Sequence, residues 1–126
     1  MNIAIALLLL VVNTVTPTQY NTKKTFKKDQ RSIIVSVEII PTNGWKWNES
    51  YPSRFSINLL PNVKLVKKDV IHSDKRLRFI FEIQGQIKPI KELTIDGTFS
   101  LCTKAVCRIW RRERFRIREK NELKNI

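Results

Sequence analysis

The chain has 126 residues, about the length of one average domain. It carries 24 Lys and Arg against 11 Asp and Glu, a formal net charge of +13, and 42% of its residues are hydrophobic. This composition excludes an acidic disordered chain and a protein that crosses a membrane many times. With 2 Cys and 1 His, the inventory is too small for a four-ligand zinc site and for most nucleophile–His hydrolases. We therefore expect no metal and no cofactor.

An uncharged apolar run at residues 3–12 opens the chain, and small and polar residues follow it. The run is about half as long as a membrane-spanning helix, which needs roughly 20 residues. This pattern predicts that residues 1–18 are a signal peptide and that the protein is exported, either to the periplasm or as a secreted protein. A buried N-terminal helix or strand is the alternative. Residues 19–31 are polar and basic without periodicity, so we expect an exposed basic lead-in, either a solvated arm or a segment that joins the sheet late.

Apolar and polar residues then alternate with period 2 along most of the chain, and β-branched residues are frequent. The pattern predicts strands at residues 32–40, 54–60, 63–67, 76–83, 98–102 and 107–117. Residues 69–74 are expected to form a loop, Asp96-Gly97 a turn, and Pro89 limits residues 87–95 to an edge strand or a loop. Roughly seven or eight short strands separated by turn signals predict an all-β, antiparallel, immunoglobulin-like β-sandwich. We place it at residues 32–118, with a polar tail at 119–126.

Cys102 and Cys107 enclose four residues, a spacing that suits a hairpin loop. An exported protein can hold a disulfide, and two cysteines allow one intramolecular pairing. In the chain-entropy model a ring this small stabilises a fold by only about 2 kcal/mol, which leaves room for a redox role. Lys104 and Arg108 flank the pair, and nearby positive charge favours the reactive thiolate. A structural disulfide and an exchange-active disulfide both remain open.

Two segments, considered together, resemble a known family. The first is Gly44-Trp45-Lys46-Trp47-Asn48 followed by Tyr51-Pro52, Phe55 and Ile57, and the second is Gly97-Thr98-Phe99-Ser100-Leu101-Cys102 followed after four residues by Cys107. Their order in a small exported β-protein resembles the N-terminal periplasmic domain of the thiol:disulfide interchange protein DsbD, and still more the small stand-alone proteins with such a domain. The resemblance covers about residues 32–117.

The resemblance implies an immunoglobulin-like sandwich in the periplasm. It also implies that Cys102 and Cys107 pass reducing equivalents between a membrane thiol reductase and oxidised periplasmic thiol proteins. One cysteine would attack a partner disulfide as a thiolate and the other would resolve the mixed disulfide. Lys104 and Arg108 would stabilise that thiolate.

Arginines crowd the last predicted strand, where period-2 alternation puts Trp110 on one face with Arg112, Arg114, Arg116 and Arg118. Clustered Arg beside Trp can bind phosphate or carboxylate groups bidentately. Nucleic acid is not the partner we expect for an exported protein. Binding of an anionic envelope polymer, a lipid headgroup or an acidic protein is therefore the alternative hypothesis to redox exchange. The stripe can also be simply a solvated strand face. We expect Trp45 and Trp47 to pack in the core or at its rim, His72 to be a solvated loop residue, and the protein to be a monomer.

Overall fold

The computed structural model describes residues 18–73 and 75–120. The predicted signal peptide, apart from Thr18, and most of the predicted tail lie outside these residues. Eight strands make up the described chain: β1 (Tyr20–Lys28), β2 (Ser32–Pro41), β3 (Lys46–Trp47), β4 (Arg54–Asn58), β5 (Val63–Ser73), β6 (Arg76–Gly85), β7 (Glu92–Cys102) and β8 (Cys107–Arg118). Within residues 18–73 and 75–120 no helix is long and apolar enough to span a membrane.

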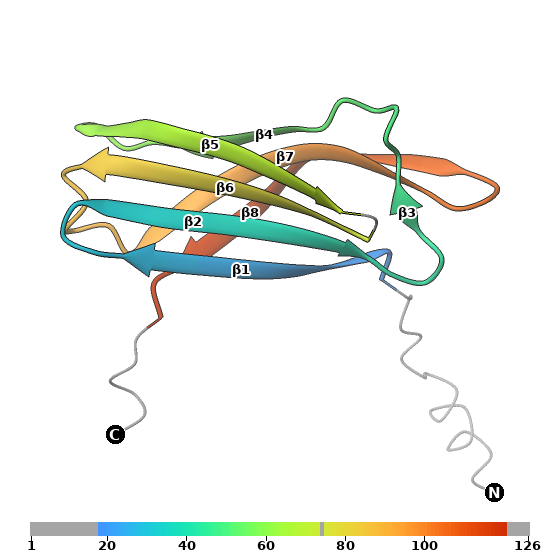
Figure 1. The fold of residues 1–126 in the computed structure, drawn as a ribbon, viewed down its shortest axis with the longest axis horizontal. Helices are drawn as coiled ribbons and strands as arrows, with labels where there is room; N and C mark the ends of the chain where they lie inside the picture. Colours follow the sequence, from blue (N-terminus) through green and yellow to red (C-terminus); the bar gives the residue numbers. More distant parts are fainter. Residues whose placement is uncertain (1–17, 74, 121–126) are drawn as a thin grey trace, which may run out of the picture.

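The strands form two antiparallel sheets packed face to face (Figure 1). One sheet has the order β1-β2-β6-β5, and in the other β7 is central. Strand β8 pairs with β7 along its whole length, so β3 and β4 share the opposite edge of β7. The predicted fold class, an all-β sandwich of antiparallel sheets, is confirmed.

The core comes from the alternation that the sequence shows. Strand β2 turns Ile33, Val35, Val37 and Ile39 inward, and all four are fully buried. They lie opposite Ile83, Phe81, Phe79 and Leu77 of β6, which are at most 2% exposed. Strands β7 and β8 form the other side of the core. Most of their buried residues are aliphatic or aromatic, and β-branched and aromatic residues pack well on a pleated surface.

The basic lead-in predicted at residues 19–31 is instead strand β1 for most of its length, paired with β2 from Tyr20 to Lys28. Only Tyr20 and Phe26 pack against the core, which is too weak an alternation to detect in the sequence. Lys28 also faces inward, and its ammonium donates to the carbonyls of Lys88 and Ile90 at 2.7 and 2.8 Å. At the following turn, Asp29 Oδ1 accepts hydrogen bonds from the backbone N–H groups of Arg31 and Ser32.

Two further local expectations are wrong. Residues 69–73, expected in a loop, continue β5, which pairs with β6 as far as Ser73 and Arg76. Asp96-Gly97, expected to be a turn, lies inside β7, where Gly97 is opposite Phe55 of β4. Because Gly97 has no side chain, the Phe55 ring can pack directly against it. Packing, and not a turn, therefore requires a glycine at this position.

Candidate functional site

The two cysteines form a disulfide at the turn end of the β7–β8 hairpin. Their Cα atoms are 4.0 Å apart and directly opposite each other in the ladder. Beyond them the Thr103 N–H donates to the Val106 carbonyl at 2.8 Å, and Thr103 Oγ1 accepts from the N–H groups of Ala105 and Val106. The turn therefore holds its shape through its own hydrogen bonds. A bonded pair of this kind indicates an oxidising compartment.

The sulfur-bearing side chains lie on the outer face of the β7 sheet. The residues that alternate with Cys102 show this, since Leu101 and Phe99 point into the core. Cys102 is partly exposed and Cys107 is exposed. A partner thiol can therefore approach Cys107 more easily than Cys102.

Lys104 and Arg108, which are next to the cysteines in the sequence, lie in different places relative to the sulfurs. Lys104 is exposed in the turn. Arg108 is opposite Leu101, on the core-facing side of the ladder, and its guanidinium lies 4.9 Å from the centre of the Trp110 ring. A third cation, Lys46 of β3, pairs directly with Cys102 and so shares its face. Nothing in the sequence signals this neighbour, because the contact depends on how β3 pairs with β7.

A β-bulge interrupts β8 between Trp110 and Glu113. Phe99 is opposite Trp110 and Gly97 is opposite Glu113, so Arg111 and Arg112 together face Thr98. Arg112 has φ 53°, and its N–H donates to Thr98 Oγ1 at 3.1 Å. A bulge shifts the alternation by one residue. Trp110 precedes the bulge and is opposite the buried Phe99, so it faces the core and is 7% exposed. The bulge then turns the arginines that follow to the outer face.

The expectation that Trp110 shares a face with the arginine stripe is wrong for this reason. Phe115 and Ile117 lie on its side of the strand, and both are buried. Arg114, Arg116 and Arg118 are exposed on the outer face. That face also carries the disulfide, since the side chain of Cys107 points away from the core before the bulge.

Carboxylates on β7 pair with two members of the stripe. Arg114 donates from Nε and Nη2 to the two carboxylate oxygens of Asp96 at 2.9 and 3.2 Å, and these hydrogen bonds hold the pKa of Asp96 below its usual value. Arg118 donates to Glu92 at 2.7 Å and likewise lowers the pKa of that carboxyl. Arg116 lies between the two pairs, opposite Thr94. Among the described residues, neither Arg116 nor Arg112 forms an ion pair.

An aromatic cluster supports the hairpin from beneath. Phe99 stacks on Trp110 with ring centres 5.5 Å apart and meets Trp47 edge-on at 5.8 Å. Trp45 packs edge-on against Trp110 at 5.9 Å. Trp45 and Trp47 are partly buried against the core, as expected. His72 is exposed as expected, but it lies on a strand, with its ring centre 6.3 Å from that of Trp47.

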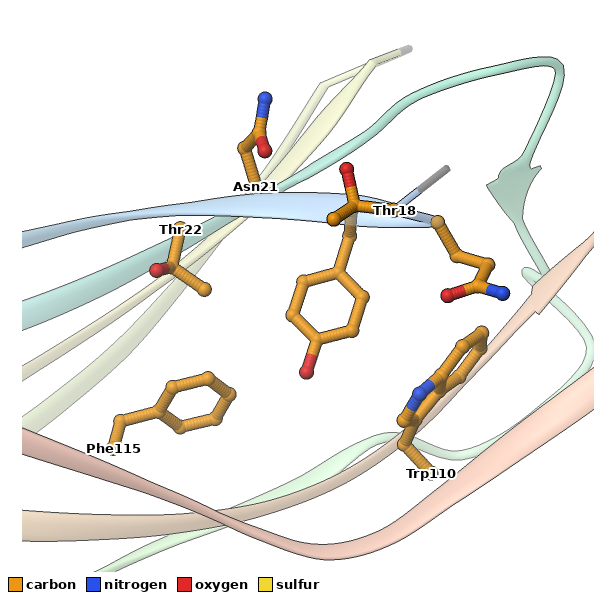
Figure 2. A pocket seen from close by; sticks show the side chains of 7 residues that line it. Thr18, Asn21, Thr22, Trp110 and Phe115 are labelled. Atoms are coloured by element: carbon orange, nitrogen blue, oxygen red, sulfur yellow. The ribbon is translucent and has the colours of Figure 1, made fainter. Parts of the chain in front are cut away.

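A groove of about 450 Å³ opens between β1 and β8, lined by Tyr20, Trp110 and Phe115 (Figure 2). The Tyr20 hydroxyl donates to Glu113 at 3.4 Å. Burial, followed by the charge of Glu113, raises the pKa of Tyr20 to about 12. The groove is on the core-facing side of β8, so it does not adjoin the sulfurs.

Within residues 18–73 and 75–120, no three His, Cys, Asp or Glu side chains gather as metal ligands. No protein-family model and no curated protein matches the chain. Among solved structures, the chain is similar to the crystal structure of the yeast GGA1 GAE domain–P21, with 10% sequence identity and a TM-score of 0.46. That match covers 85% of this chain and 96% of the other.

Proposed function

We propose that the protein exchanges disulfides with other exported proteins through Cys102 and Cys107. The observation that carries the proposal is the place of the bond, between two opposed residues at the exposed end of a hairpin. The turn has its own hydrogen bonds, and the β7–β8 ladder continues on the other side of the cysteines. The bond can therefore open while both strands stay paired and both thiols remain adjacent.

The exchange takes place in two balanced steps. The Cys107 thiolate attacks a disulfide of the substrate protein, forming a mixed disulfide and releasing one substrate thiolate. The Cys102 thiolate then attacks the Cys107 sulfur of that mixed disulfide, re-forming the Cys102–Cys107 bond and releasing the second substrate thiolate. Two electrons pass to the substrate, and a membrane thiol reductase restores the dithiol by the reverse exchange.

Positive charge on the outer face favours the thiolate form of the attacking cysteine. Lys46 shares the face of Cys102, and Lys104 belongs to the turn between the sulfurs. We assign both residues a supporting role. Arg108 contributes through the field of the hairpin and not by contact, because it stacks on Trp110 on the other side of the ladder.

The decisive measurement is the reduction potential of the pair, obtained by equilibration with glutathione and thioredoxin buffers. Exchange predicts a value of about −230 mV or higher. A value well below about −300 mV would identify a structural bond and overturn the proposal. The Cys102→Ser variant, which keeps the attacking Cys107, should accumulate mixed disulfides that reducing agents release, whereas the double variant with Cys107→Ser should trap none.

The contribution of Lys46 has a matched control. Lys46→Gln should raise the pKa of the attacking thiol in the reduced protein and slow its alkylation at neutral pH. Lys88→Gln removes the same charge from the loop between β6 and β7 and should leave both quantities unchanged. Equal effects of the two substitutions would show that only the overall charge matters.

A second function is favoured by Arg116, which forms no ion pair with residues 18–73 or 75–120 and lies between the paired Arg114 and Arg118. We propose that the outer face of β8 binds an anionic polymer of the envelope, through Arg112 and Arg116 in the first place. Binding to polyphosphate should weaken with rising salt and with the Arg112→Ser and Arg116→Ser substitutions. If binding of polyphosphate changes neither with salt nor with these substitutions, the proposed anion site on β8 is wrong.

A further inference from the structure

Strand β5 is a long edge strand with one free side. It has eleven residues and pairs with β6, and within residues 18–73 and 75–120 no strand pairs with its other edge (Figure 1). A free edge presents a row of backbone N–H and C=O groups that another extended chain can pair with. The edge is thus able to accept a further strand.

Apolar side chains are exposed on both faces of β5. Leu65 and Val70 are opposite Ile83 and Phe79 of β6, which places them on the core-facing side of the sheet, yet they are 38% and 50% exposed. Ile71, on the outer face, is 49% exposed. Apart from Val63 at its start, which packs against the core, β5 extends beyond the core, and side chains of an added strand would find apolar contacts on either face.

The charge of the edge is positive. Lys64, Lys67 and Lys68 belong to β5, and its single carboxylate, Asp69, is paired with Lys67 at 3.4 Å. The Lys68 ammonium is on the core-facing side, 5.9 Å from the centre of the Phe81 ring. Lysines on an edge are a common defence against uncontrolled strand pairing. They repel basic segments, but the same charges attract an acidic one.

We propose that β5 receives an extended segment of a partner protein in which acidic and apolar residues alternate, so that the segment becomes the fifth strand of its sheet. Its backbone pairs with the free edge of β5. Its apolar side chains cover Leu65 and Val70 on the core-facing side, and its carboxylates meet Lys64 and Lys67. This inference does not depend on disulfide exchange at the hairpin.

A second copy of this chain fits the edge poorly. Lys68 is the central residue of β5, so antiparallel pairing of two full-length copies would set Lys68 of one copy directly opposite Lys68 of the other. Like charges directly opposite each other destabilise a strand pair. The formal net charge of +13 adds long-range repulsion.

Three labelled peptides of about nine residues test the proposal by fluorescence anisotropy with the full chain. One alternates glutamate with valine, one alternates lysine with valine, and one alternates glutamate with serine. We expect the first to bind most tightly, since it alone supplies both charge and apolar surface. Hydrogen exchange of the backbone amides should slow along β5 when the glutamate–valine peptide binds. Equal binding of the glutamate–serine peptide, protection confined to β1 or β8, or dimerisation of the free protein through β5 would each overturn the proposal.

Substitutions separate the edge from the overall charge. Lys64→Glu with Lys67→Glu should weaken binding of the glutamate–valine peptide at least tenfold. The matched control, Lys23→Glu with Lys27→Glu on the other edge strand of the same sheet, should change it less than threefold. Val70→Ser should weaken binding about tenfold through loss of apolar contact. Identical losses in both pairs of lysine variants would refute a site on β5.

Discussion

Replacement of Gly97 by alanine tests the packing that joins β4 to β7. The added Cβ would lie 2.7 Å from Cδ2 and Cζ of the Phe55 ring, and closer still to Cε2, a separation that real Cβ atoms essentially never show. The ring cannot move away easily, because Phe55 is 2% exposed and stacks on Phe79 with ring centres 3.3 Å apart. We expect the fold to lose about 1–3 kcal/mol, the usual cost of overpacking a core.

Urea unfolding followed by tryptophan fluorescence measures this loss, with an unchanged denaturant slope. In a domain of about 100 residues, the loss corresponds to a fall of about 4–8 °C in Tm for each kcal/mol. Ser56→Ala, on the exposed face of β4, is the control and should stay within about 0.5 kcal/mol.

The double variant supplies the refutation. Phe55→Leu removes the ring that an alanine at position 97 would strike, so the cost of Gly97→Ala should shrink by at least about 1 kcal/mol in that background. If the two substitutions prove additive, or if Gly97→Ala alone is neutral, the Phe55 ring does not require this glycine.

Three shorter predictions concern the charged face and the groove. Arg112 sits in the left-handed region, so Arg112→Gly should leave the free energy of unfolding within about 0.5 kcal/mol, while Arg112→Val should cost about 1–2 kcal/mol in the same urea assay. The hydrogen bonds from Arg114 hold the pKa of Asp96 below 3.8. The Asp96–Arg114 pair therefore stabilises the fold above that pH and loses its effect as the pH falls through the lowered pKa. Arg114→Gln should raise that pKa, as seen by carboxyl-carbon NMR, and an unchanged titration would contradict the ion pair. In a Tyr51→Phe background, ultraviolet titration should show Tyr20 ionising near pH 12; the raised pKa means that its contribution to stability is complete below pH 10 and is lost as the pH rises toward 12.

The sequence predicts the fold class well, because the signal is repeated in every strand. Residues 32–40 and 76–83 alternate without interruption, and they form the buried centre of the first sheet. Strand β1 was missed because its inward row contains Lys24 and Lys28 besides its two aromatic residues. The end of β5 was missed because an edge strand exposed on both faces has no apolar alternation to read.

The candidate site was predicted in part. The hairpin and its cysteines follow from spacing alone, and the structure places them as expected. The grouping of Trp110 with the arginines failed because one extra residue at the bulge reverses the alternation, and nothing in Arg111-Arg112 distinguishes a bulge from a regular strand. Lys46 could not be foreseen, because its place beside Cys102 depends on pairing between segments far apart in the chain.

The closeness of the two cysteines along the chain also affects how the fold is reached. A separation of five residues makes their encounter a local event, as fast as the closing of a hairpin and requiring none of the distant strands. The contact between Tyr20 and Glu113, 93 residues apart, has to wait until both ends of the domain are present. During synthesis from the N-terminus, β8 is the last of the eight described strands to emerge, so we expect the two cysteines to meet late in time but early in the pairing of β7 with β8. We therefore expect the two sulfurs to come together before the groove between β1 and β8 forms.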